Sequence, residues 1–139
     1  MRAAVAGVGL WLALTAPTVP ACGYCIEDQI AAAYDQAVVN QALARQHHVA
    51  FFHLDAPPAP DAETHRRLTT LAESMPGVDR GSVRISAETS ALSLAFDPQR
   101  LSPGKLRQRL ASHLVMRGFS VELLRVMEKP AEFKASGRK

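Results

Sequence analysis

Residues 82–97 read SVRISAETSALSLAFD, and this stretch decides the fold class. Two runs in it, 82–86 and 91–97, alternate apolar side chains with polar or small ones, which is the period of a β-strand with one buried face. Residues 87–90 make the turn between them. The side chains predicted to point together into a core are Val83, Ile85, Leu92, Leu94 and Phe96.

A helix is predicted on each side of this hairpin. Upstream, Asp61 follows Pro60 as an N-cap, and Pro76-Gly77 ends the helix. Downstream, Ser102 caps a second helix with Pro103 at its first position, and Gly118 ends it. The predicted core-facing stripes are Thr64, Leu68, Leu71, Ala72 and Met75 in the first helix, and Leu106, Leu110, His113 and Leu114 in the second.

Two further strands lie outside these helices, at 48–55 and 119–127. The first is rich in Val49, Phe51 and Phe52 and stops at a proline-rich loop. The order across residues 47–127 is then β-α-β-β-α-β, which predicts an α+β domain of the ferredoxin-like type, with a sheet on one side and two helices on the other.

Several landmarks in this domain resemble the heavy-metal-associated domain family. They are Pro76-Gly77-Val78, Phe96-Asp97-Pro98, and Leu106, Leu110 and Gly118 of the second helix. The resemblance covers about residues 49–126. It implies a ferredoxin-like module that carries copper or another soft metal.

The loop after the first strand departs from this family. The family's metal-binding C-x-x-C lies there, whereas residues 54–61 of this chain read LDAPPAPD and contain no cysteine. Either the domain serves as a scaffold without metal transport, or another pair of cysteines supplies a replacement site.

Cys22-Gly23-Tyr24-Cys25 contains both cysteines of the chain. The pair cannot join distant parts of the fold, and a two-residue loop removes little entropy from the unfolded chain, so chemistry is favoured over stabilisation. Two thiolates at a helix start suit Cu(I) or a related soft ion. Zinc normally takes four ligands and would have to recruit His47 and His48 or a second chain.

Three alternatives for Cys22 and Cys25 remain open. A C-x-x-C at a helix N-terminus also suits thiol–disulfide exchange, which is the one enzymatic activity the sequence indicates. Cys22 also follows Val19-Pro20-Ala21, so it is a candidate for lipidation as the first residue of a lipoprotein. A passive local disulfide in a non-catalytic interaction module is the third alternative.

A single extra helix is predicted over residues 26–46, which contain no Gly or Pro. With Cys22 and Cys25 it makes a C-x-x-C-bearing segment at 22–46. Glu27 and Asp28 in its first turn suit the helix dipole but oppose formation of a thiolate nearby. The predicted buried stripe is Ile26, Ile30, Ala33, Tyr34, Ala37 and Val38.

The N-terminus has the layout of a secretory signal peptide, residues 1–21. Arg2 precedes an uncharged, largely apolar run at 3–16, and small residues follow at Val19-Pro20-Ala21. The run is shorter than the roughly 20 residues of a membrane-spanning helix, so no transmembrane segment is expected after cleavage. The sequence thus predicts a periplasmic or secreted protein with a solvated tail at 128–139.

Composition narrows the partners. The chain has 139 residues, 47% of them hydrophobic, and a net charge of +3. This charge is spread over segments of mixed sign and gives no footprint for nucleic acid. The expected partners are a metal ion and a protein for metal or thiol exchange. Of the other candidates, His65 is expected at the surface, and Met75, Met116 and Met127 in the core.

Overall fold

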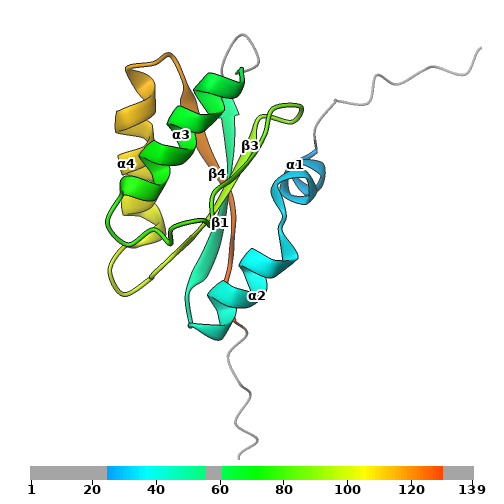
Figure 1. Ribbon diagram of the computed structural model, residues 1–139, viewed down its shortest axis with the longest axis vertical. Coiled ribbons are helices and arrows are strands. Elements are labelled where there is room, and N and C mark those ends of the chain that lie inside the picture. The colour runs from blue at the N-terminus through cyan, green and yellow to red at the C-terminus, as the bar shows by residue number, and fades with distance from the viewer. Residues whose placement is uncertain (1–24, 56–60, 130–139) are drawn as a thin grey trace, which may run out of the picture.

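The computed structural model describes residues 25–55 and 61–129, which form one sheet between two layers of helices (Figure 1). The strands are β1 (His48–Asp55), β2 (Arg84–Ser86), β3 (Ala91–Phe96) and β4 (Ser120–Met127), in the spatial order β2-β3-β1-β4. Neighbouring strands are antiparallel throughout. The helix α3 (Ala62–Ser74) connects β1 to β2, and α4 (Pro103–Val115) connects β3 to β4. This is the ferredoxin-like arrangement, so the predicted fold class is confirmed.

Some predictions concern residues outside those described. They are the signal peptide, Cys22, the loop at 56–60 and the tail from residue 130 onward.

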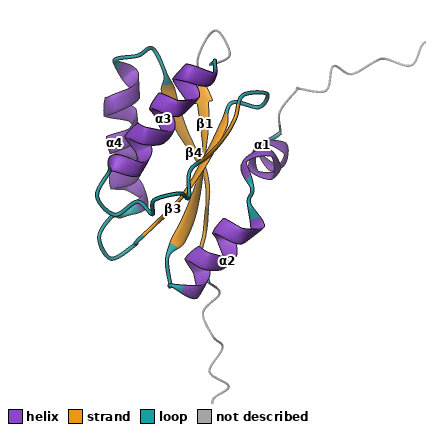
Figure 2. Cartoon of the chain, in the orientation of Figure 1, coloured by secondary structure: helices purple, strands orange, loops and turns teal. Residues whose placement is uncertain are grey.

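The helices α3 and α4 cover one face of the sheet (Figure 2). The predicted direction of the apolar side chains is confirmed there, because Val83, Leu92, Leu94 and Phe96 are all buried in one cluster under these helices. The prediction of one buried face is wrong for β3, since all six of its residues are buried. Ile85, Leu71 and Val121 are partly buried at its margin. The remaining buried members are Ala50, Phe52, Leu54, Leu68, Ala72, Met75, Leu101, Leu106, Leu110, Leu114 and Phe119.

The ends of α3 and α4 follow the predicted capping. The Asp61 carboxylate accepts a hydrogen bond from the Thr64 N–H at 2.8 Å, and the Ser102 hydroxyl accepts one from the Lys105 N–H at 3.3 Å. Gly118 adopts φ +80°, a conformation that glycine takes without strain. These local signals worked because each cap depends on residues only a few positions away.

Two predictions on α4 and its end are wrong. His113 is exposed, because the inner face of α4 is made by residues spaced four apart, Leu106, Leu110 and Leu114, which leaves 113 on the flank. Met116 follows the last helical residue and is 87% exposed.

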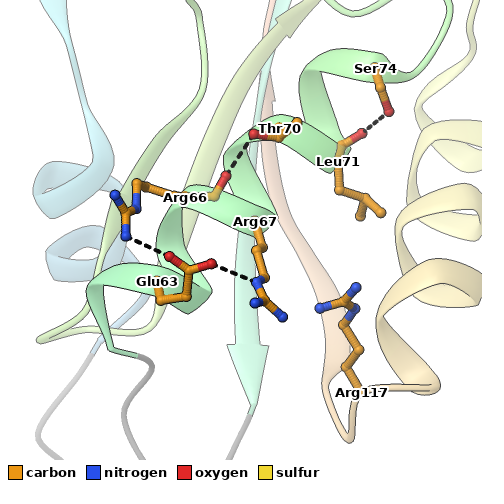
Figure 3. A pocket seen from close by; sticks show the side chains of 7 residues that line it. All are labelled: Glu63, Arg66, Arg67, Thr70, Leu71, Ser74 and Arg117. Carbon is orange, nitrogen blue, oxygen red and sulfur yellow. Dashed lines mark hydrogen bonds and ion pairs between the residues drawn. The ribbon is translucent and has the colours of Figure 1, made fainter.

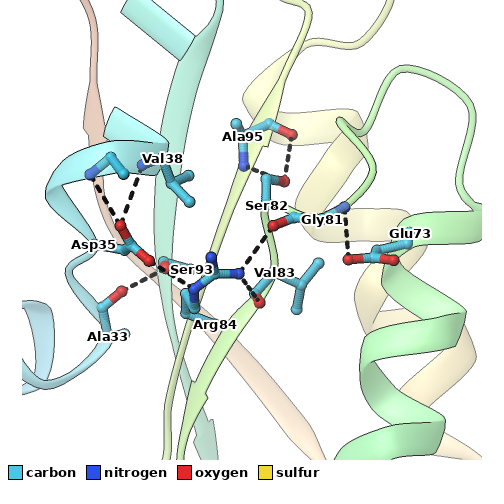
Figure 4. Close-up of polar contacts among 11 residues, drawn as sticks. Ala33, Asp35, Val38, Glu73, Gly81, Ser82, Val83, Arg84, Ser93 and Ala95 are labelled. Carbon is cyan, nitrogen blue, oxygen red and sulfur yellow. Dashed lines mark hydrogen bonds and ion pairs between the residues drawn. The ribbon is translucent and has the colours of Figure 1, made fainter. Parts of the chain in front are cut away.

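The prediction of one helix over residues 26–46 is also wrong. The segment forms two helices, α1 (Ile26–Ala33) and α2 (Gln36–Ala44), with Tyr34 and Asp35 extended between them. Asp35 caps α2, because its carboxylate accepts hydrogen bonds from the N–H groups of Ala37 at 2.9 Å and Val38 at 3.2 Å. Its second oxygen accepts a hydrogen bond from Arg84 Nε on β2 at 2.8 Å (Figure 4). A partner far away in sequence therefore helps to fix the break.

The break changes which side chains are buried. Ile30, Ala33 and Val38 lie in the core as predicted, but Ile26, Tyr34 and Ala37 are exposed. Gln29, Val39 and Ala42 are buried in their place. A continuous helix would keep one phase along its length, whereas two extended residues reset the phase between α1 and α2.

The second helical layer packs on the sheet face opposite α3 and α4 (Figure 1). The residues paired in one row across the four strands are Arg84, Ser93, Phe51 and Arg125. Glu27 pairs with Arg125 on β4, the Ala33 carbonyl accepts a hydrogen bond from Ser93 Oγ on β3 at 2.6 Å, and Asp35 pairs with Arg84 on β2. The segment from Glu27 to Asp35 therefore crosses the strands along this row, with the N-terminus of α1 toward the edge strand β4.

Candidate functional site

Of the two cysteines, Cys25 lies within the residues that the structure describes. It stands immediately before α1 in an extended conformation, and its thiol is free and exposed. Its carbonyl accepts the first hydrogen bond of the helix, from the Gln29 N–H at 3.1 Å, while its side chain makes no capping hydrogen bond. The sulfur is thus open to solvent at the N-terminus of α1, the positive end of the helix dipole.

The charges around Cys25 are partly compensated. Glu27 and Asp28 lie in the first turn of α1 and oppose a thiolate. Arg125 Nη1 on β4 lies 3.2 Å from Glu27 Oε2, and hydrogen bonding to Glu27 raises the pKa of Arg125 further above its ordinary value. This ion pair offsets one of the two carboxylates and fastens the N-terminal end of α1 to the sheet.

The position of Cys25 differs from the metal loop of the heavy-metal-associated family. That loop follows the first strand, on the side where β1 leads into α3. Cys25 instead begins a helix on the opposite face of the sheet, near β4. Cys25 therefore lies on the sheet face opposite α3 and α4.

The histidines do not converge on Cys25. His47 Nδ1 donates a hydrogen bond to the Asp79 carboxylate at 2.8 Å, and the His48 ring packs edge-on against Phe96. His65 is half-buried on α3, not at the surface as predicted. Within residues 25–55 and 61–129, no group of three or more His, Cys, Asp or Glu side chains is placed to hold a metal ion. Recruitment of His47 and His48 by a zinc ion has no support in this arrangement.

His53 is the histidine that shares the sheet face with α1. It follows Phe51 by two positions on β1 and is half-buried, and its Nδ1 has no hydrogen-bond partner among the described residues. His53 lies on β1, the strand next to β4, and Arg125 on β4 contacts Glu27 at the N-terminal end of α1.

Arg84 and Arg125 are the residues that sequence reasoning missed. Each places a guanidinium group on the sheet face that α1 and α2 cover, and each pairs with a carboxylate of the α1–α2 segment. A signal was present, since Arg84 lies between Val83 and Ile85 and therefore points away from the core under α3 and α4.

None of the helices in the described ranges combines the length and apolar character needed to cross a membrane.

Comparisons with known proteins give similarities in structure but none in sequence. The sequence matches no protein-family model and no curated protein. Its structure is similar to the crystal structure of a copper binding domain from HMA7, a P-type ATPase, with 13% sequence identity, a TM-score of 0.45, and coverage of 57% of this chain and 96% of that one. It is also similar to oxidized MerP from Ralstonia metallidurans CH34, with 16% identity, a TM-score of 0.43, and coverage of 55% and 96%. The fold assignment itself rests on the strand order and connections given above.

Proposed function

We propose that the protein handles a soft metal ion of the Cu(I) type, which it binds through the thiolates of Cys22 and Cys25. The observation that carries the proposal is the free, exposed thiol of Cys25 at the first turn of α1. A near-linear Cu(I) site needs only two sulfur ligands, and C-x-x-C spacing at a helix start brings two thiolates together.

The anchoring of α1 supports this proposal. Glu27 lies two residues from Cys25 and is tied to Arg125, while the other end of the helix is held by the Ser93 hydrogen bond to Ala33. A ligand presented on a fixed helix keeps its position, which reduces the entropy lost when a metal binds. The protein therefore presents Cys25 from the outer helical layer, with the ferredoxin-like domain as support.

We also propose that the protein works outside the cytoplasm after removal of residues 1–21. Mass spectrometry of the exported product is expected to give a chain beginning at or near Cys22. A diacylglyceryl mass on Cys22 would move the protein to the lipoprotein class, and an intact Met1 on a cytosolic product would contradict export.

Metal uptake by the reduced protein tests the main proposal. We expect about one Cu(I) per chain or per dimer, measured by competition with a chromophoric chelator. Cys22→Ser and Cys25→Ser are each expected to abolish tight binding, because a two-ligand site cannot lose half of its sulfur. His47→Gln is the matched control and should bind as the unaltered protein does. Unchanged affinity in the double serine variant would contradict the proposal.

Thiol–disulfide exchange is the second candidate, since the exposed thiol at a helix N-terminus suits it as well. It predicts exchange with glutathione at a potential well above about −300 mV, the region of structural disulfides. A pair that neither binds Cu(I) nor exchanges would leave a passive disulfide or a lipid anchor on a non-catalytic interaction module.

A further inference from the structure

A groove lies on the outer surface of the domain, between α3 and the end of α4, far from the row of contacts that holds α1. Its volume is about 490 Å³. One face of α3 lines it with Glu63, Arg66, Arg67, Thr70 and Ser74, and Arg117 closes it from the residue after the C-cap of α4 (Figure 3).

The charges in the groove do not balance. The lining has three guanidinium groups and one carboxylate, and this carboxylate, of Glu63, accepts hydrogen bonds from both Arg66 and Arg67, the latter from Nε at 2.8 Å. The side chain of Arg117 forms no hydrogen bond or ion pair with any residue in the described ranges. The lining therefore carries two uncompensated positive charges at neutral pH.

The two helices bring these charges close together. Figure 3 shows the guanidinium groups of Arg67 and Arg117 pointing toward one another from opposite sides of the groove. The two positive charges repel each other, and an anion bound between them would attract both and offset this repulsion. The hydroxyl groups are less available as donors, since Thr70 donates to the Arg66 carbonyl at 2.9 Å and Ser74 donates to the Leu71 carbonyl at 2.6 Å.

We propose that this groove binds a phosphate group between Arg67 and Arg117. A tetrahedral phosphate presents oxygens in several directions and can accept hydrogen bonds from both arginines at once. The charge of a phosphomonoester, about −1.5 to −2 at pH 7, also matches the excess charge of the lining.

The phosphate is either a free ion or the headgroup of an anionic lipid. Val115 and Met116, which precede Arg117, are 63% and 87% exposed. Apolar side chains beside a phosphate-binding arginine would enter the acyl boundary of a bilayer if the phosphate belongs to a lipid.

Phosphate titration tests the proposal on the full chain. Backbone NMR shifts of Thr70, Ser74 and Arg117 are expected to saturate with added inorganic phosphate at constant ionic strength, and chloride should not reproduce them. Arg117→Gln and Arg67→Gln should each weaken binding by about tenfold or more, since each removes a charge-assisted donor. Arg117→Gln is the cleaner variant, because it breaks no ion pair within the protein.

Arg107→Gln is the matched control. It removes the same charge from an exposed position of α4 that does not line the groove, so it should leave phosphate affinity unchanged. If Arg107→Gln weakened phosphate binding as much as Arg117→Gln, or if the NMR shifts did not saturate, the binding would be nonspecific electrostatic attraction and the proposal would be overturned.

Vesicle sedimentation distinguishes the two sources of phosphate. Binding to vesicles that contain phosphatidic acid, a phosphomonoester lipid, but not to phosphatidylcholine vesicles, lost in Arg117→Gln and weakened in Met116→Ser, would identify a lipid headgroup. Saturable binding of inorganic phosphate without vesicle binding would identify a free ion or small phosphate ester. Vesicle binding that persists in Arg117→Gln, without binding of free phosphate, would contradict the proposal.

Discussion

The two faces of the sheet are covered in different ways. Under α3 and α4 the buried cluster has fifteen residues, two of them alanine, and includes Phe52, Phe96 and a series of leucines. Under α1 and α2 the buried cluster has nine residues, four of them alanine. The second layer therefore removes less apolar surface from water per residue, and less of its stability comes from burial.

Polar contacts hold the second layer in place on the sheet. The α1–α2 segment is joined to three strands by Glu27 with Arg125, Ala33 with Ser93, and Asp35 with Arg84. Such contacts fix position more than they add free energy, because exposed ion pairs contribute little. The comparison indicates a stable domain that carries an outer layer able to open separately.

The largest effect is expected from Leu110→Ala, which removes a fully buried side chain between α4 and the sheet. The lost burial and the resulting cavity should lower the free energy of unfolding by about 2–5 kcal/mol. Denaturant unfolding followed by circular dichroism measures this loss. Val115→Ala on the same helix removes a side chain that is 63% exposed and should leave stability nearly unchanged. A small loss of unfolding free energy in Leu110→Ala would mean that the core under α4 is not the main source of the domain's stability.

A smaller and local effect is expected from Ile30→Ala in the second layer. Ile30 is 5% exposed in the smaller cluster, so the substitution should lower the stability of this layer by about 2 kcal/mol. Amide hydrogen exchange should accelerate roughly 30-fold in α1 and α2 and hardly change in α4. Ile26→Ala, one turn earlier and 51% exposed, is the control. Equal acceleration in both layers would show that they unfold together.

The smallest effect is expected from acid. Hydrogen bonds, first from the Val38 N–H and then from the Arg84 side chain, hold the pKa of the Asp35 carboxyl below its ordinary value of 3.8. Its contribution is thus fully present above the ordinary pKa and is lost as the pH falls through the lower, folded-state pKa. Exchange in α2 should accelerate over that range.

Asparagine variants separate this contribution from the rest of the domain. Asp35→Asn keeps an N-cap but loses the charge, so the acid response of α2 should disappear. Asp61→Asn at the cap of α3 is the matched control, because hydrogen bonding to Thr64 also lowers the pKa of Asp61. It should leave the acid response of α2 intact. If Asp61→Asn also abolished the acid response of α2, the response would belong to the whole domain and not to Asp35.

The sequence by itself determined the parts of the protein that depend on near neighbours. The direction of the apolar side chains in β3 and the caps at Asp61 and Ser102 were predictable, because strand period and capping act over a few residues. The candidate cysteines were likewise visible from spacing alone, and Cys25 proved to begin a helix, as the sequence predicts.

Tertiary structure helps to fix the break at Asp35, and it alone decided the second helical layer and the groove between α3 and Arg117. The first depends on Arg84, 49 residues from Asp35, and the last on two arginines that approach only when α3 and α4 pack side by side. Periodicity reports which side of an element is apolar, but it does not report which charged groups distant in sequence meet. Such meetings are set by how the elements pack, and here they place both Cys25 and the phosphate groove.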